Sequence, residues 1–208
     1  MIVFAGMIGA GKTTYTEALS ERLGTLPFYE SVDDNPVLDR FYNNPKKWGF
    51  SLQIFFLNKR FKSIKEALTN DNNVLDRSIY EDALFTEINF KQGNIDKVNM
   101  EIYNDLLDNM MDELKGMPKK RPDLLIYLHG SFETILSHIK KRGRDYEQWD
   151  DDPELLAYYK LLHDNYKQWY KKYDKSPKIM IDIDKFDIIN DKEKVLDYIV
   201  KEIEKVRQ

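Results

Sequence analysis

The sequence predicts an α/β fold in which a five-stranded parallel sheet is flanked by helices. Three observations support this prediction. Short apolar runs alternate with longer segments of helical period, several of these runs are almost continuously apolar, and each run ends at a polar residue or a glycine. The alternation is typical of parallel sheets covered by helices, and continuous apolarity is typical of strands buried on both faces. Ligands of such sheets bind at the carboxyl ends of the strands.

Five runs are expected to form the strands: residues 2–5, 26–29, 74–75, 124–128 and 178–181. They are followed by Gly6, Glu30, Asp76, His129 with Gly130, and Asp182. Because the carboxyl ends of parallel strands meet at one edge of the sheet, we expect the chemistry of the protein at these positions.

Four segments have clear helical period: residues 13–23, 50–68, 98–114 and 195–206. The first stops at Gly24, which suits a left-handed helix cap. The apolar arc of 98–114 is wide, and it leaves two alternatives, a buried helix or a homodimer interface. Since no repeat or linker interrupts the chain, we expect residues 1–208 to form a single domain.

Composition excludes several classes of protein. The 208 residues contain no cysteine, and 32 basic against 36 acidic side chains leave a net charge of −4. Disulfides, cysteine-based zinc sites and thiol nucleophiles are therefore excluded, and an acidic chain argues against nucleic-acid binding. No apolar run approaches the roughly 20 residues of a membrane span, and the first residues lack the pattern of a signal peptide. We expect a cytoplasmic protein that binds neither nucleic acid nor a membrane.

The segment from Gly6 to Thr13 matches the phosphate-binding P-loop pattern G-x-x-x-x-G-K-[ST] between an expected strand and an expected helix. Glycines allow the backbone to approach a phosphate closely, and successive N–H groups form a nest for the anion. Lys12 adds positive charge, and the Thr13 hydroxyl suits Mg²⁺. The residues predicted to bind the nucleotide phosphates are Gly6, Gly9, Ala10, Gly11, Lys12, Thr13 and Thr14.

A P-loop leaves the reaction open, because kinases, GTPases and mechanical ATPases share it. The D-x-x-G and N-K-x-D elements of small GTPases are missing from the sequence. Glu30 would repel a substrate that already carries a phosphate, and it suits a neutral hydroxyl as hydrogen-bond acceptor or general base. The alternative for Glu30 is an ordinary surface glutamate after a strand.

Gln53, Phe56 and Arg60 share one face of the helix 50–68, since Gln53 and Arg60 are two turns apart. An amide, an aromatic ring and a guanidinium are suited to reading a heterocyclic base. The alternative is a solvated polar face on an amphipathic helix.

Asp76 and Arg77 leave the edge of the sheet together. Asp76 could accept the proton of an acceptor hydroxyl or hold Mg²⁺, and Arg77 could stabilise the transferring charge; an ordinary surface ion pair is the alternative. Arg142 and Arg144 flank a glycine in a basic stretch, which favours a lid over phosphates or else a basic surface loop. The three histidines show no metal-binding spacing, and we expect them to be structural.

Taken together, these motifs resemble the deoxyribonucleoside kinase family, most closely its bacterial deoxyadenosine/deoxyguanosine kinase branch. The likeness runs from Met1 to about Asn190. Its specific pieces are GMIGAGKTT, FYESVDDNP, QIFFLNKR, LDRSIYEDALF, IYNDLLDNMM, KKRGRDYEQ and SPKIMIDIDKFD.

The resemblance implies a P-loop kinase that transfers the γ-phosphoryl group of Mg·ATP to the 5′-hydroxyl of a deoxyribonucleoside, for nucleotide salvage. Deoxyadenosine is the first expected substrate, followed by deoxyguanosine or deoxycytidine. Two alternatives remain, a nucleoside monophosphate kinase such as thymidylate kinase and a non-catalytic nucleotide-binding regulator. A homodimer through the helices around 50–68 and 98–114 is also implied.

The resemblance further implies a role for each matching residue. Asp76 would accept the 5′-hydroxyl proton close to Glu30, with Asp76 and Thr13 as the metal-binding pair and Arg77 on the phosphates. Tyr42 and Glu147 would bind the sugar 3′-hydroxyl, and the base would be contacted by Gln53, Phe56, Arg60 and Asp82. Arg142 and Arg144 would belong to a lid at about 140–148. The backbone around Asp184 and Phe186 would hold the adenine of ATP.

Overall fold

The computed structural model describes residues 1–30, 32, 34–115 and 121–208, and these residues form two compact units. Unit 1 contains Met1–Tyr29, Ala67–Arg77 and Arg121–Gln208. Unit 2 contains Glu30–Glu66 and Ser78–Lys120. That the whole chain is a single domain stays a prediction.

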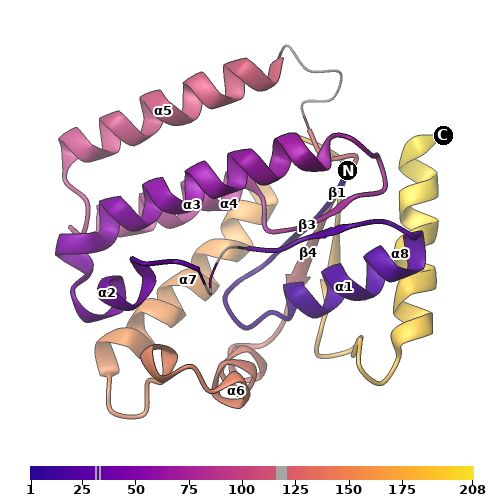
Figure 1. Cartoon of the computed structure of the whole chain (residues 1–208). Coiled ribbons are helices and arrows are strands. Elements are labelled where there is room, and N and C mark those ends of the chain that lie inside the picture. Colours follow the sequence, from indigo (N-terminus) through magenta and orange to yellow (C-terminus); the bar gives the residue numbers. More distant parts are fainter. Residues whose placement is uncertain (31, 33, 116–120) are drawn as a thin grey trace. The chain divides into compact units, whose positions relative to one another are not determined.

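The core of unit 1 is a five-stranded sheet with the order β2-β3-β1-β4-β5, in which every pairing is parallel (Figure 1). This confirms the predicted sheet. The strands are β1 (Ile2–Ala5), β2 (Pro27–Phe28), β3 (Val74–Asp76), β4 (Leu124–His129) and β5 (Lys178–Asp182). The central strand β1 is buried along its whole length, as its apolar run predicts.

The predicted boundary of the second strand is wrong by about one residue at each end. The edge strand β2 contains only two residues, and both are half-buried. Glu30 therefore lies two residues beyond the end of the strand and belongs to unit 2.

Two helices of unit 1 cover opposite faces of the sheet. The ring of Phe4 on β1 packs against the ring of Tyr15 on α1 (Lys12–Leu23), with 5.6 Å between the ring centroids. The next residue, Ala5, pairs with Tyr127 of β4, whose ring stacks on α7 (Pro153–Lys172). Since successive residues of a strand point to opposite faces, α1 and α7 lie on opposite sides of the sheet.

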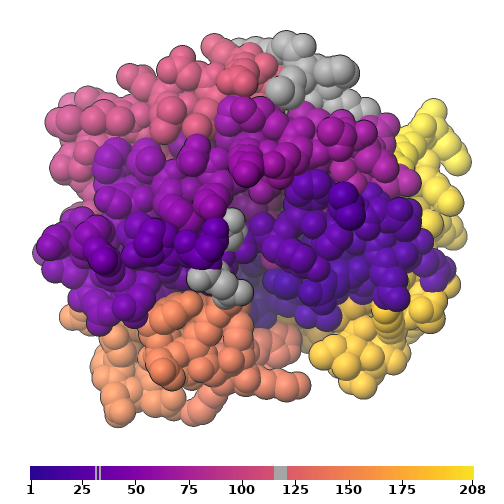
Figure 2. Space-filling model, in the orientation of Figure 1, coloured from indigo at the N-terminus to yellow at the C-terminus, as the bar shows by residue number. Residues whose placement is uncertain are grey.

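The rest of unit 1 follows the strands β4 and β5. After β4 the chain forms α6 (Phe132–Arg142), which ends at the left-handed Gly143, and then a short 3-10 turn, Asp145–Glu147. The last helix, α8 (Lys192–Arg207), packs against α1, and Figure 2 shows the two helices adjacent on the surface in yellow and indigo.

Unit 2 is helical, with α2 (Leu38–Asn43), α3 (Pro45–Ala67, which runs to the boundary of the unit), α4 (Ile79–Lys91) and α5 (Lys97–Lys115). Ser78 begins α4 with a capping box: its hydroxyl accepts from the Glu81 amide at 3.3 Å, and Glu81 accepts from the Ser78 amide at 2.8 Å. Helix α5 packs on α4, and an ion pair between Lys65 and Glu113 joins it to α3.

In the described part of the chain, one side of α5 is exposed. Val98 is 63% exposed and Ile102 is 49% exposed, whereas Tyr103 of the same helix is fully buried. The alternative of a buried helix is therefore wrong, because most described residues of α5 are exposed or half-buried. Separately, no helix in the described part of the chain is both long enough and apolar enough to cross a bilayer.

Candidate active site

The loop between β1 and α1 has the backbone that its glycine pattern predicts. Gly9 and Gly11 adopt φ values of +83° and +82°, a region that side chains disfavour. A Cβ atom on Gly9 would also lie 2.7 Å from Cγ1 of Ile139 and 2.9 Å from the carbonyl oxygen of Ile135. Glycine at position 9 is thus required by conformation and by the close approach of α6.

Lys12 is almost completely buried at the start of α1. Its ammonium group donates to the carbonyl oxygen of Met7 at 3.2 Å, and the amide of Ala10 donates to the same oxygen at 3.1 Å. The loop therefore holds its own lysine against its backbone. A positive charge placed in this way suits a phosphate cradled by the loop.

A hydrogen bond joins the start of α1 to the end of β3. The Thr13 hydroxyl donates to Oδ2 of Asp76 at 2.7 Å, and Asp76 is 2% exposed. The two oxygens suit Mg²⁺, which prefers hard oxygen ligands and is often held by one or two protein groups together with water and substrate phosphates. The donor set thus fits the predicted metal-binding role of both residues.

Arg77, which directly follows Asp76, is held in an unusual conformation. Its φ of +78° makes it the one non-glycine residue of the described chain with positive φ. Its amide donates to the Phe4 carbonyl at 2.8 Å, and its Nη1 donates to the Tyr166 hydroxyl at 2.6 Å. Strained backbone of this kind is often found at functional sites.

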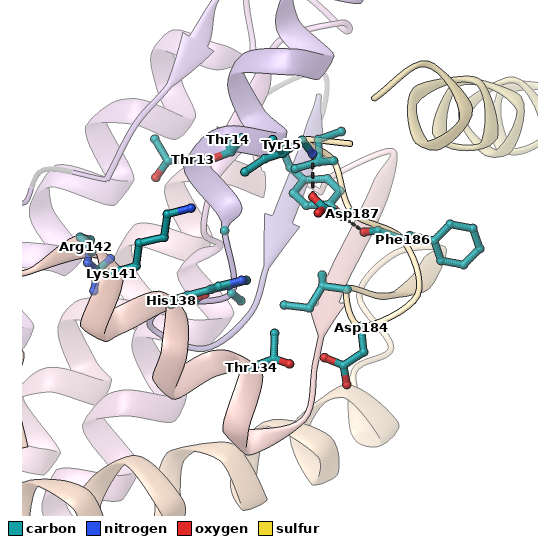
Figure 3. Close-up of a pocket in the computed structure, with 16 residues that line it drawn as sticks. Thr13, Thr14, Tyr15, Thr134, His138, Lys141, Arg142, Asp184, Phe186 and Asp187 are labelled. Atoms are coloured by element: carbon teal, nitrogen blue, oxygen red, sulfur yellow. Dashed lines mark hydrogen bonds between the residues drawn. The ribbon is translucent and has the colours of Figure 1, made fainter. Parts of the chain in front are cut away.

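A pocket of about 620 Å³ opens beside the loop, entirely within unit 1. Figure 3 shows Thr13, Thr14 and Tyr15 on α1 and His138, Lys141 and Arg142 on α6, with the chain after β5 on another side. The full lining is Gly9, Ala10, Gly11, Thr13, Thr14, Tyr15, Thr134, His138, Lys141, Arg142, Ile183, Asp184, Phe186, Asp187, Ile188 and Ile189. A pocket of this size with a P-loop on one wall can hold a nucleotide.

The two residues predicted near the adenine line this pocket in different ways. The ring of Phe186 points away from the cavity in Figure 3 and stacks on Tyr198 at an interplanar angle of 10°. Its carbonyl oxygen accepts from the Tyr15 hydroxyl at 2.8 Å, and burial raises the pKa of Tyr15, which keeps this donor protonated. Phe186 therefore contributes backbone.

Asp184 binds Ser131, the N-cap residue of α6. One carboxylate oxygen accepts from the Ser131 amide at 2.8 Å. Partial burial opposes ionisation, but hydrogen bonds from Thr134 and Ser131 outweigh it and lower the pKa of Asp184. The charged carboxylate thus ties α6 to the chain after β5, which forms another wall of the pocket.

The predicted lid folds back on itself. Glu147 is 3% exposed, and its Oε2 accepts from Arg142 through Nε at 3.0 Å and through Nη2 at 2.5 Å. Arg144 lies 3.6 Å from Oε1 of the same carboxylate. The hydroxyl of Tyr159 on α7 donates to the Glu147 carbonyl at 3.1 Å. One buried carboxylate therefore pairs with both lid arginines.

In unit 2, Arg60 lies between two carboxylates. Its Nη2 is 3.1 Å from Oε1 of Glu30, and its Nε is 3.2 Å from Oδ2 of Asp82. Arg60 and Asp82 are nearly inaccessible, and the side chain of Glu30 is 17% exposed. Because one positive charge faces two negative charges, this cluster has no net attraction for an anion. Glu30 is thus more than a surface carboxylate.

Gln53 is 3% exposed and accepts from the Thr86 hydroxyl at 3.3 Å. Since Gln53 and Arg60 are both buried, the alternative of a solvated polar face on α3 is wrong. Tyr42 on α2 and Phe56 on α3 are half-buried. Their rings pack edge-on against Phe41 and Phe55, respectively.

The structure brings some of the predicted residues of each unit together, and it adds others. Thr13, Lys12 and Asp76 meet at one edge of the sheet in unit 1, while Glu30, Arg60 and Asp82 meet in unit 2. His138, interpreted from sequence as structural, lines the pocket, and its Nδ1 is 2.9 Å from the Gly9 carbonyl. Its signal was its position one helical turn before Arg142.

Tyr15, Lys141 and Tyr166 were also missed as site residues. Tyr15 and Lys141 line the pocket, and Tyr166 holds Arg77. Lys141 could have been found from its place in the basic stretch. The hydrophobic stripe of α1 marks Tyr15 only as a core residue, and no motif marks Tyr166.

Comparison with known proteins gives consistent results. The deoxynucleoside kinase family model matches residues 2–207. The chain is 56% identical to a deoxyguanosine kinase of Lactobacillus johnsonii, over 99% of this chain and 93% of that protein. It is 50% identical to a deoxyadenosine kinase of Lactobacillus acidophilus, over 91% and 88% of the two chains.

A solved structure gives the same result for the fold. The structure of deoxyadenosine kinase from M. mycoides with bound dCTP superposes with a TM-score of 0.81 at 31% identity, covering 97% of this chain and 100% of that chain. The family match spans almost the whole sequence, and it confirms the resemblance predicted from the motifs. This chain belongs to the deoxynucleoside kinase family.

Proposed function

We propose that this protein transfers the γ-phosphoryl group of ATP to the 5′-hydroxyl of a purine deoxyribonucleoside. The observation that carries the proposal is the hydrogen bond between Thr13 and Asp76, because it places a buried carboxylate directly at a phosphate-binding loop. The family membership and the nucleotide-sized pocket support it.

The proposed donor site is the pocket of unit 1. The P-loop amides and Lys12 hold the phosphates, and the apolar side chains after β5, Ile183, Ile188 and Ile189, cover the base. Mg²⁺, held by Thr13 and Asp76, would neutralise charge on the phosphates. Positioning and charge stabilisation supply most of the rate in reactions of this kind.

Asp76 is the proposed general base. As the 5′-oxygen bonds to the γ-phosphorus, the bond from that phosphorus to the bridging oxygen of ADP breaks, and the hydroxyl proton moves to the carboxylate. Arg77, Arg142 and Arg144 stabilise the charge of the transferring group. The lid arginines reach this role by leaving Glu147, which then has carboxylate oxygens for the sugar 3′-hydroxyl.

The cluster of unit 2 is the proposed base-recognition element. Gln53 offers an acceptor and a donor on one amide, which matches the hydrogen-bonding edge of a base. The two carboxylates around Arg60 disfavour an acceptor that already carries a phosphate. This argues against the alternative of a nucleoside monophosphate kinase.

A purine is favoured by the relatives, which are a deoxyguanosine kinase at 56% identity and a deoxyadenosine kinase at 50% identity. Deoxyadenosine as the first substrate remains the prediction from sequence, with deoxyguanosine as its main competitor. A cytoplasmic location likewise stays a prediction from the cysteine-free composition.

We also propose a homodimer through α3 and α5. Val98 and Ile102 are exposed apolar residues one turn apart on α5, and the same spacing continues to the half-buried Leu106 and Met110. An apolar stripe of this length on one helix is suited to packing against a second copy.

The substrate test uses Mg·ATP with each of the four deoxyribonucleosides and, separately, each of the four monophosphates. We expect monophosphate formation with the highest kcat/KM for a purine deoxyribonucleoside and the lowest for thymidine. The products are separated by anion-exchange chromatography. Phosphorylation of monophosphates alone would identify the alternative kinase, and ATP binding without any transfer would identify a regulator.

Asp76→Asn should lower kcat by roughly 10²- to 10⁴-fold, the usual contribution of a general base. The KM for ATP should change much less than kcat, because the asparagine amide keeps an oxygen for Thr13 and Mg²⁺, and the P-loop amides and Lys12 still hold the phosphates. Steady-state kinetics measure both constants. The control is Glu204→Gln, on the exposed surface of α8, and wild-type kcat in Asp76→Asn would remove Asp76 from the proposed role.

Gln53→Ala should raise the KM for the deoxyribonucleoside by about tenfold, because hydrogen bonds worth about 1–3 kcal/mol are lost in a buried site. The KM for ATP should stay within about twofold. Gln168→Ala, at an exposed position of α7, is the matched control. An equal rise in both KM values would contradict base recognition by Gln53.

Ile102→Asp should convert the dimer to a monomer, since a charge on the apolar stripe loses its solvation if the interface forms. Sedimentation velocity measures the mass. Leu26→Asp, at a position 67% exposed in unit 1, should leave the dimer intact. A monomeric wild-type protein, or a dimeric Ile102→Asp variant, would reject this interface.

A further inference from the structure

We infer that Tyr166 is a positioning residue for Arg77, so that a buried hydroxyl on α7 sets the direction of a guanidinium at the end of β3. The inference rests on the proposed function, because it assigns Arg77 to the transferring phosphoryl group. Both residues belong to unit 1.

Arg77 depends on outside contacts to keep its conformation. Its φ of +78° is disfavoured for a residue with a side chain, and the hydrogen bond from its amide to Phe4 holds the backbone. The side chain is 3% exposed, so water does not solvate it as it would at a surface. Its orientation must come from protein groups.

The contact with Tyr166 is short and well placed for this purpose. Nη1 of Arg77 donates to the Tyr166 hydroxyl oxygen at 2.6 Å. The five N–H donors of a guanidinium lie in one rigid plane. A bond at one corner of the plane therefore restricts the direction of the whole group, which a flexible ammonium would not experience.

The ring of Tyr166 is itself packed between other rings. It is fully buried, and it lies parallel to the ring of Tyr127 on β4, with 6.1 Å between the ring centroids and an interplanar angle of 1°. The ring of Trp169, one turn later on α7, packs edge-on against it, with 5.9 Å between the ring centroids and an interplanar angle of 70°. The sheet and the helix thus fix the ring, and the ring fixes the hydroxyl. Preorganised groups of this kind accelerate a reaction because they need not reorient when charge develops.

The test compares Tyr166→Phe with Tyr173→Phe. Each variant loses one hydroxyl near the same tryptophan and keeps its ring; the hydroxyl of Tyr173 contacts Ser176 at 2.9 Å. Tyr166→Phe should lower kcat by about tenfold, equal to about 1.4 kcal/mol in the barrier, with the KM for ATP within about twofold. Tyr173→Phe should keep the wild-type kcat. Rates are measured where circular dichroism shows every variant folded.

A double-mutant cycle with Arg77→Ala separates positioning from a general loss of stability. Without the guanidinium, adding Tyr166→Phe should lower kcat no further, because the hydroxyl acts through Arg77. If Tyr166→Phe does not fold, Tyr166→Met replaces it, since the flexible methionine side chain fills irregular gaps without supplying this acceptor.

Wild-type kcat in the Tyr166 variant, or the same loss with and without Arg77, would overturn the inference. Failure of the wild-type protein to phosphorylate any deoxyribonucleoside would instead overturn the proposed function. The two failures are distinguishable, because the second is seen in the wild-type protein before any variant is compared.

Discussion

The parallel pairing of β1 with β3 is the constraint on which the candidate active site depends. In this register Phe4 lies opposite Asp76, and the Arg77 amide continues the ladder to the Phe4 carbonyl. The phosphate-binding loop leaves β1 two residues after Phe4, and the Asp-Arg pair leaves β3 at the same level. A slip of one residue would turn Asp76 to the other face of the sheet and break its bond to Thr13.

The charge distribution explains how an acidic protein can bind a polyanion. The net charge of −4 describes the chain as a whole, but unit 1 places basic side chains at the phosphate-binding loop and beside it. Lys12 begins α1 at the end of the loop, and Lys141 and Arg142 of α6 line the pocket. In unit 2, two carboxylates surround Arg60. Opposite local charges therefore suit a triphosphate in one unit and a neutral nucleoside in the other, which agrees with the assignment to a kinase of nucleosides.

The sequence was sufficient to predict the sheet and the polar residues that follow its strands. The buried strands β1, β3 and β4 have continuous apolar runs, and their predicted boundaries, like those of the less buried β5, differ from the structure by at most one residue. The division into two units was not predicted, because chain segments from three parts of the sequence build unit 1. The partners of the buried arginines could not be predicted either, since Arg60 and Glu30 are 30 residues apart in the sequence and Arg77 and Tyr166 are 89 residues apart. Helical period shows which face a residue occupies, but not which distant carboxylate or hydroxyl will meet it.

The conformation of Arg77 shows why such long-range contacts matter for chemistry. A positive φ at a side-chain-bearing residue costs of order 1–3 kcal/mol, so a local sequence preference alone would not keep it. Here the amide is bound by β1 and the side chain is bound by α7, both in unit 1. The conformation of Arg77 is thus held by two separate elements. Because both are formed by folding, the strain at Arg77 is offset before substrate binds, and no binding energy is needed to create that geometry.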